Sequence, residues 1–377
     1  MSDDADDLSD ETEVPEIQPD PSITPELFLS WCSPRFGASN PEMMTNPVWD
    51  WLVRSELSAY QANQRFNGPS PFDAGPGWCF QRYGKSETLL PDGRVVFVAG
   101  EHEDHYDPDF FIYNDVVVRH PNGQIEIFGY PKDVFPPTDF HSATLADDQI
   151  VIIGNLGYLE TRKPGGITPV FILDLASFAI TSMQTSGPSP GWVYEHTASL
   201  SEDKRTILVS HGKLDRGEGG SLVENIDDWL LHLTDWRWER LTERRWLRWE
   251  VLRADGKRNH IWEIQQAAWS RSVGWHKELA KQLEQLEADL GIRPTLDLLE
   301  TLFRPPIAHD LIAPVEDEYS VFRIRIAGVV VRYVFDMYSI QITVEGDLDQ
   351  PSVAAVTSDF IEKLSALENA NIALKQI

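Results

Sequence analysis

Residues 101–109 carry the densest set of groups in the chain that could bind a metal ion. They offer two imidazoles and five carboxylates within nine residues, and this mixture suits zinc, iron or manganese. The candidate ligands are His102, Asp104, His105 and Asp107. Their spacing matches no defined metal motif, so a solvated or hydrogen-bonded loop is the alternative. This loop allows a metal-dependent hydrolase or oxidoreductase. No catalytic residue can be assigned from the sequence.

Two histidines, His141 and His196, occupy the same place in two copies of a repeated segment. The first copy has Lys85 at that place. Equivalent positions in a repeat face the same surroundings, so we expect each imidazole to be hydrogen-bonded within its own unit. Two members of one catalytic site are the alternative.

Tryptophans alternate with basic residues over 236–258. Aromatic and basic residues together can hold single-stranded nucleic acid, but interspersed acids and a net charge of -28 oppose that partner. Tryptophan and arginine also dominate protein-binding surfaces. We therefore predict a protein partner, with Trp236, Trp238, Arg245 and Trp246 as binding residues.

The elements that must position these residues form a repeat. Segments 88–100, 141–154 and 196–212 each read as strand, acidic turn, apolar strand and glycine. A polar loop and a second hairpin follow each of them, with turn residues at the reversals. The pattern predicts three four-stranded units between residues 77 and 242.

This segment resembles the kelch repeat. The likeness rests on the strand-turn-strand-glycine pattern, on Gly187-Pro-Ser-Pro-Gly191 before the third unit, and on Asp235-Trp-Arg-Trp238 in its closing strand. It implies a β-propeller or a stack of four-stranded blades. Closed propellers usually need four to eight blades, so other segments complete the ring or the sheets stack openly. Galactose oxidase shares this fold and uses copper with a cysteine-linked tyrosine, a pair to which no residue here is matched.

The kelch pattern also expects a glycine pair after the second strand of each unit. This sequence has Ala99-Gly100, Gly154-Asn155 and His211-Gly212 there. We take Gly100, Gly154 and Gly212 as the equivalent glycines of the three units.

Segments on both sides of the repeats complete the expected architecture. Residues 1–25 contain nine acids and no base, which predicts a disordered tail. Residues 26–76 form a helical lead-in, with one helix that Asn46 caps and Gly68 ends. Residues 243–377 are predicted as an α+β domain, so the fold class is mainly β with α+β.

That last domain is expected to contain a hairpin, two helices and a β-β-β-α stretch. The hairpin turns at Asp255, and the short helix covers 295–303. The strands are expected at 321–326, 329–335 and 338–344. The long helix, 265–290, should bury one stripe made of Trp269, Val273, Leu279, Leu283, Leu286 and Leu290.

Composition bears on the cellular location of the protein and on its function. Cys32 and Cys79 without an apolar export segment favour free thiols and a cytoplasmic location. No run is long enough to span a membrane, and no cofactor is expected beyond the metal considered above. The leading hypothesis is a kelch-like protein-binding module. Its alternatives are the metal-dependent enzyme and an acidic, immunity-type inhibitor of a basic toxin.

Overall fold

A computed structural model describes residues 22–102, 109–163, 166–215, 222–315 and 320–377. The chain divides into two compact units, Met1–Glu243 and Arg244–Ile377. The described residues form mainly antiparallel sheets with eight α-helices. Among them, no helix has the length and apolar character needed to cross a membrane.

The first unit begins with helices α1 (Pro25–Trp31), α2 (Pro47–Ser55), α3 (Ala59–Phe66) and α4 (Pro71–Ala74). Asn46 caps α2 as expected, since its side chain accepts hydrogen bonds from two N–H groups of the first turn. The expectation of one helix here is wrong. Glu56 adopts the left-handed conformation and ends α2, and Ser58 starts α3 with a capping box.

The acidic tail predicted for residues 1–25 lies almost entirely outside the described residues. Its last part is ordered, because the Thr24 hydroxyl caps α1 and Ile23 is buried.

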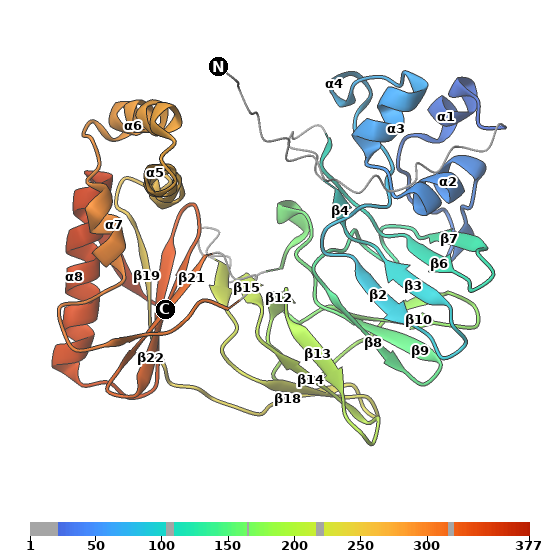
Figure 1. Ribbon diagram of the computed structural model, residues 1–377. Coiled ribbons are helices and arrows are strands. Elements are labelled where there is room, and N and C mark those ends of the chain that lie inside the picture. Colours follow the sequence, from blue (N-terminus) through green and yellow to red (C-terminus); the bar gives the residue numbers. More distant parts are fainter. Residues whose placement is uncertain (1–21, 103–108, 164–165, 216–221, 316–319) are drawn as a thin grey trace, which may run out of the picture. The chain divides into compact units, whose positions relative to one another are not determined.

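Three four-stranded antiparallel sheets follow, one for each predicted unit (Figure 1). We call them sheets 1, 2 and 3. Strand β1 (Glu42–Met43) joins the edge of sheet 1. Two small sheets lie in the connections: β4 (Glu101–His102) with β5 (Phe111–Ile112), and β12 (Trp192–Tyr194) with β15 (Lys213–Asp215) and β16 (Leu222–Glu224). The strands of the three sheets are, in order, β2 (Ser86–Leu89), β3 (Val95–Val98), β6 (Val116–Arg119) and β7 (Ile125–Gly129); β8 (Ser142–Ala146), β9 (Gln149–Ile153), β10 (Val170–Asp174) and β11 (Ile180–Ser182); β13 (Thr197–Leu200), β14 (Thr206–Ser210), β17 (Trp229–His232) and β18 (Arg237–Arg240).

Alternation along the strands explains how the sheets pack. Val96 of β3 and Ile152 of β9 belong to the apolar core between sheets 1 and 2. Val151, next to Ile152, belongs to the core between sheets 2 and 3. Phe97 points the other way and packs with helix α2. Among the described residues no core cluster joins sheet 3 to sheet 1, and helix α2 packs on the face of sheet 1 that is turned away from sheet 2.

The glycine equivalence expected from the sequence is wrong by one residue. Gly154 N–H donates to Pro169 O, and Ala99 N–H donates to Asp115 O, each at the start of its third strand. Ala99, Gly154 and His211 all have positive φ, at 52°, 78° and 60°. Gly154 therefore corresponds to Ala99 and His211, since each follows the residue that pairs with the same position of the first strand: Val98 with Ser86, Ile153 with Ser142, and Ser210 with Thr197.

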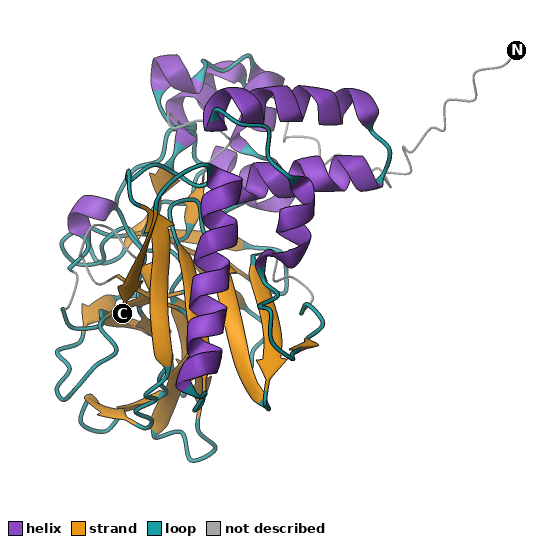
Figure 2. Cartoon of the chain, turned by 90° about the vertical axis from the view of Figure 1, so that its left-hand side faces the viewer, coloured by secondary structure: helices purple, strands orange, loops and turns teal. Residues whose placement is uncertain are grey.

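The second unit is one six-stranded antiparallel sheet, of order β20-β21-β22-β23-β19-β24, with helices packed on its apolar face (Figure 2). Strands β21 and β22 lie where the sequence predicted them. The bounds are β19 (Leu247–Arg253), α5 (Ile261–Ser272), α6 (His276–Leu290), α7 (Leu296–Leu302), β20 (Asp310–Leu311), β21 (Val321–Ile326), β22 (Val329–Phe335), β23 (Ile340–Glu345), α8 (Gln350–Glu368) and β24 (Ile372–Gln376).

Two expectations for this unit are wrong. The hairpin around Asp255 does not form, because Ile261 and Trp262 begin helix α5 and β19 pairs with β23 instead. The long helix is two helices, because Gly274 adopts φ 78° between α5 and α6. Strand β24, which pairs with β19, was not expected.

Candidate functional site

The predicted metal loop is only partly described. Glu101 and His102 form strand β4, which pairs with β5 (Phe111–Ile112), and His102 is buried. Asp104, His105 and Asp107 lie outside the described residues. Among the residues that are described, no group of three histidine, cysteine or acidic side chains could hold a metal ion. The metal site stays a prediction, which elemental analysis of the purified protein would decide.

Near Glu101 the connections of the repeats bring charged groups together. Asp139 is fully buried, and its carboxylate accepts a hydrogen bond from Gly157 N–H at 2.6 Å. Burial raises the pKa of Asp139, although this N–H, Glu101 and Arg162 oppose the rise. Arg162 also lies 3.4 Å from the Asp215 carboxylate. No sequence motif marks Asp139, which only the fold places beside these partners.

The two repeated histidines connect neighbouring sheets. His141 Nε2 lies 2.9 Å from Ser86 Oγ, and His196 Nε2 lies 2.8 Å from Ser142 Oγ. Each imidazole thus bonds the sheet before its own, and not its own sheet as the sequence suggested. Burial lowers the pKa of His141 to about 3, with a contribution from His196, and lowers that of His196 to about 4. Both rings are neutral at pH 7, and their equivalent partners fit a structural role.

The predicted tryptophan and arginine residues differ in burial. Trp238 is fully buried in the core between sheets 2 and 3, which removes it from the binding set. Trp236 is half-buried against the same core. Arg245 is exposed and Trp246 is half-buried, with Arg244 5.4 Å from its ring centre. The boundary between the two compact units separates the first pair from the second.

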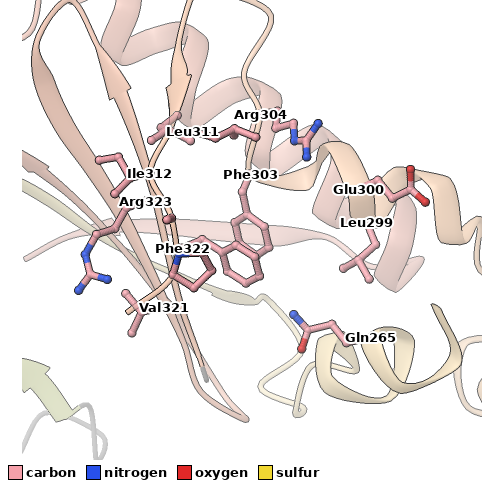
Figure 3. Close-up of a pocket in the computed structure, with 13 residues that line it drawn as sticks. Gln265, Leu299, Glu300, Phe303, Arg304, Leu311, Ile312, Val321, Phe322 and Arg323 are labelled. Carbon is pink, nitrogen blue, oxygen red and sulfur yellow. The ribbon is translucent and has the colours of Figure 1, made fainter. Parts of the chain in front are cut away.

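The second unit has an apolar groove of about 760 Å³ (Figure 3). Its floor includes Phe303 and Phe322, whose rings stack with centres 4.1 Å apart. Helix α7 contributes Leu299, and the edge strand β20 contributes Leu311, which is largely exposed. The exposed Arg304 lies at its margin. The groove can bury an apolar side chain or ligand.

A second feature of this unit is an exposed aromatic surface on α5 and the turn after it. Trp262, Trp269 and Trp275 are 61%, 48% and 55% exposed, and Val273 beside them is exposed as well. The indoles of Trp269 and Trp275 meet edge to face, with ring centres 4.8 Å apart. We call these four residues the tryptophan surface.

The sequence did not reveal this surface, because its apolar pattern predicted one continuous helix over 265–290. In such a helix Trp269 and Val273 would share the buried stripe of Leu283 and Leu286. The break at Gly274 ends that alignment. Of the predicted stripe, only the leucines of α6 lie in the core or pack against it. Gly274, a weak helix former inside the predicted helix, was the available signal.

Comparisons with known proteins give no family. No family model matches the sequence, and no curated protein matches it. The solved structure of YjhT matches with a TM-score of 0.28 and 12% identity, covering 45% of this chain and 54% of that one. A fungal alcohol oxidase of the AA5 family, in complex with copper, matches with a TM-score of 0.28 and 10% identity, covering 44% of each chain. The chain spans about half the length of these structures, and likenesses this low carry no argument here.

Proposed function

We propose that this chain is a kelch-like protein-binding module whose tryptophan surface contacts a partner protein. The observation that carries the proposal is the exposure of three indoles within one helix and the turn that follows it. The stack of three sheets supports the kelch-like assignment. The two free cysteines support the cytoplasmic setting.

Burial of these indoles against a partner would release a large favourable free energy. Fully burying one large apolar side chain is worth roughly 1.5–3 kcal/mol. Tryptophan is also the residue type most enriched among those that dominate binding energy. Contiguous exposed apolar residues are uncommon on soluble proteins without a binding role.

Trp275 adds a second argument, because it occupies a position where another residue would serve the fold better. It is the N-cap of α6, and its side chain makes no capping hydrogen bond. Serine, threonine, aspartate or asparagine at an N-cap typically stabilises a helix by about 1 kcal/mol. Residues that conflict with their local structure concentrate at functional sites, which fits a role for Trp275 in binding.

Arg245 and Trp246 stay candidates for the same role. Both belong to the second unit, and Arg245 is exposed. Their contribution is secondary in this proposal, because Arg244 already lies over the Trp246 ring.

The test compares proteins captured from a lysate of the source cells by three forms of the chain. The first is the parent, and the second carries Trp262→Gln, Trp269→Gln and Trp275→Gln. The third is a control in which the comparably exposed Leu89, Leu159 and Ile167 are replaced by glutamine. We expect the same protein to bind the parent and the control and to be lost from the tryptophan variant.

Equal capture by the tryptophan variant would refute the proposed surface. Circular dichroism and the urea midpoint of each form establish that the variants are folded.

A further inference from the structure

The chemistry of the partner follows from a groove beside the tryptophan surface. Helices α5 and α6 pack side by side and enclose a groove of about 560 Å³. Trp262 and Gln266 line it from α5, and Gln282, Gln285 and Leu286 line it from α6. Trp262 is the main exposed apolar surface of this groove, because Leu286 is only 2% exposed and belongs to the core of the unit.

Acidic side chains dominate the margin of the groove. Glu278, Glu284 and Asp289 of α6 line the groove and are exposed. No ion pair is found for these three in the described part of the chain. On the other side, Arg258 is neutralised by Glu263 at 2.6 Å. Lys281 is then the remaining base, so the margin attracts cations.

The groove and the tryptophan surface are continuous along α5. Trp262, Gln266, Trp269 and Val273 recur at intervals of three and four residues, which places them on one face of the helix. At 1.5 Å per residue this face is roughly 16 Å long. That length corresponds to about three turns of a partner helix and exceeds what a small ligand would cover.

We propose that the α5–α6 groove receives a cationic amphipathic helix of the partner protein. This inference rests on the proposed function and names the partner's chemistry. The apolar face of the incoming helix packs on Trp262 and, further along the same face of α5, on Trp269, in the manner of helix-in-groove recognition. Its lysines or arginines meet Glu278, Glu284 and Asp289, and they also contact the exposed indole faces.

Charge argues against two other occupants. A second copy of the chain in a two-fold contact would bring the same acidic margin against itself, and like charges facing each other are repelled. An anionic membrane surface would be repelled for the same reason.

The experiment titrates the full chain with a helical peptide of about 18 leucine and lysine residues, long enough to cover the groove. A leucine and glutamate peptide of the same pattern is the matched probe. We expect the lysine peptide to bind in calorimetry and the glutamate peptide not to bind. Trp262→Gln should lower the affinity for the lysine peptide by at least about tenfold, because an indole anchor is lost.

Charge-reversal variants distinguish binding at the groove from attraction by the net negative charge of the whole chain. The variant Glu278→Lys, Glu284→Lys, Asp289→Lys should also lose at least about tenfold in affinity. The control is Asp148→Lys, Glu160→Lys, Glu202→Lys, which makes the same change of net charge at exposed positions of the first unit. It should change affinity less than about threefold.

Three results would overturn the inference. The first is equal binding of both peptides, and the second is an equal loss in the groove and control variants. The third is a concentration-dependent dimer in sedimentation that Trp262→Gln abolishes, which would assign the groove to a second copy. If a lysate protein is still captured through the tryptophans in any of these cases, the proposed function stands and only the partner's chemistry is refuted.

Discussion

His196 of sheet 3 is hydrogen-bonded to Ser142 of sheet 2, with 2.8 Å between Nε2 and Oγ. His141 and Ser86 repeat this contact between sheets 2 and 1 at 2.9 Å. A backbone hydrogen bond repeats in the same way one residue earlier. Glu195 N–H donates to Phe140 O, and Phe140 N–H donates to Gly84 O. One side chain of each later repeat thus fixes its register against the repeat before it.

The series of contacts ends at the third repeat. Thr197 stands where Ser86 and Ser142 stand in the first two repeats. Its hydroxyl lies 3.0 Å from Ser210 Oγ and 3.2 Å from His211 Nδ1, both of which belong to its own repeat. Thr197 therefore bonds within its own repeat, whereas Ser86 and Ser142 bond the histidine of the next one.

Acidification should destabilise the protein through His141 and His196. Their pKa values are about 3 and about 4 in the folded chain, against 6.5 for an ordinary histidine. As the pH falls below 6.5, the unfolded chain binds protons that the folded chain does not, so stability is lost between pH 6.5 and about 4. Each imidazole contributes about 1.4 kcal/mol per pH unit in this window.

Urea unfolding at pH 7 and pH 5 measures this effect. The parent should lose roughly 4 kcal/mol more than a variant carrying His141→Gln and His196→Gln, which removes the imidazoles and keeps a hydrogen-bonding side chain. Carboxylates titrate in both proteins, so their contribution cancels in the comparison. Equal losses would show that the histidines are protonated alike in both states.

Gly154→Ala should lower the free energy of unfolding by about 3 kcal/mol, from left-handed strain together with a steric clash. A Cβ atom there would lie 2.3 Å from Val193 O and 2.7 Å from His196 Cε1. Gly291 is also left-handed, with φ 72° and ψ 1°, and among the described residues the only atom within 4 Å of its Cβ position is Asn369 Nδ2 at 3.8 Å. Gly291→Ala should therefore cost only about 1 kcal/mol. Urea midpoints that shift equally would contradict the clash.

Arg82→Met should lower the free energy of unfolding by about 3–5 kcal/mol, because it leaves a buried carboxylate without its cation. Arg82 and Asp115 are both buried and are joined by two hydrogen bonds, and the guanidinium lies 3.4 Å from the Tyr113 ring centre. Adding Asp115→Asn should restore at least about 1 kcal/mol, since the neutral amide oxygen still accepts from Trp78 Nε1. No recovery in urea unfolding would argue against an electrostatic cause.

Trp275→Ser should raise the stability of the second unit by about 0.5–1 kcal/mol while it weakens partner binding. Serine can cap α6, which the indole does not. Thermal unfolding measures the first effect, and the capture experiment measures the second. A fall in melting temperature would mean that the contact between Trp275 and Trp269 stabilises the fold more than a cap would.

Local signals in the sequence were enough for much of the secondary structure. The Asn46-Pro47 start of α2, the strands of the three repeats, and strands β21 and β22 all follow from capping and alternation. These signals act between residues close in the chain, so they need no knowledge of the fold. The helix broken at Gly274 was one of the failures, because a strong apolar period concealed one weak residue.

Burial and partnership were decided only by the tertiary structure. Trp238 and Trp262 look alike in the sequence, yet the first is fully buried between two sheets and the second is 61% exposed. Ser86 and His141 are 55 residues apart in the chain, and no local pattern pairs them. Whether an indole lies in a core or on a surface depends on which distant segments pack against it, and that is a property of the assembled sheets and helices.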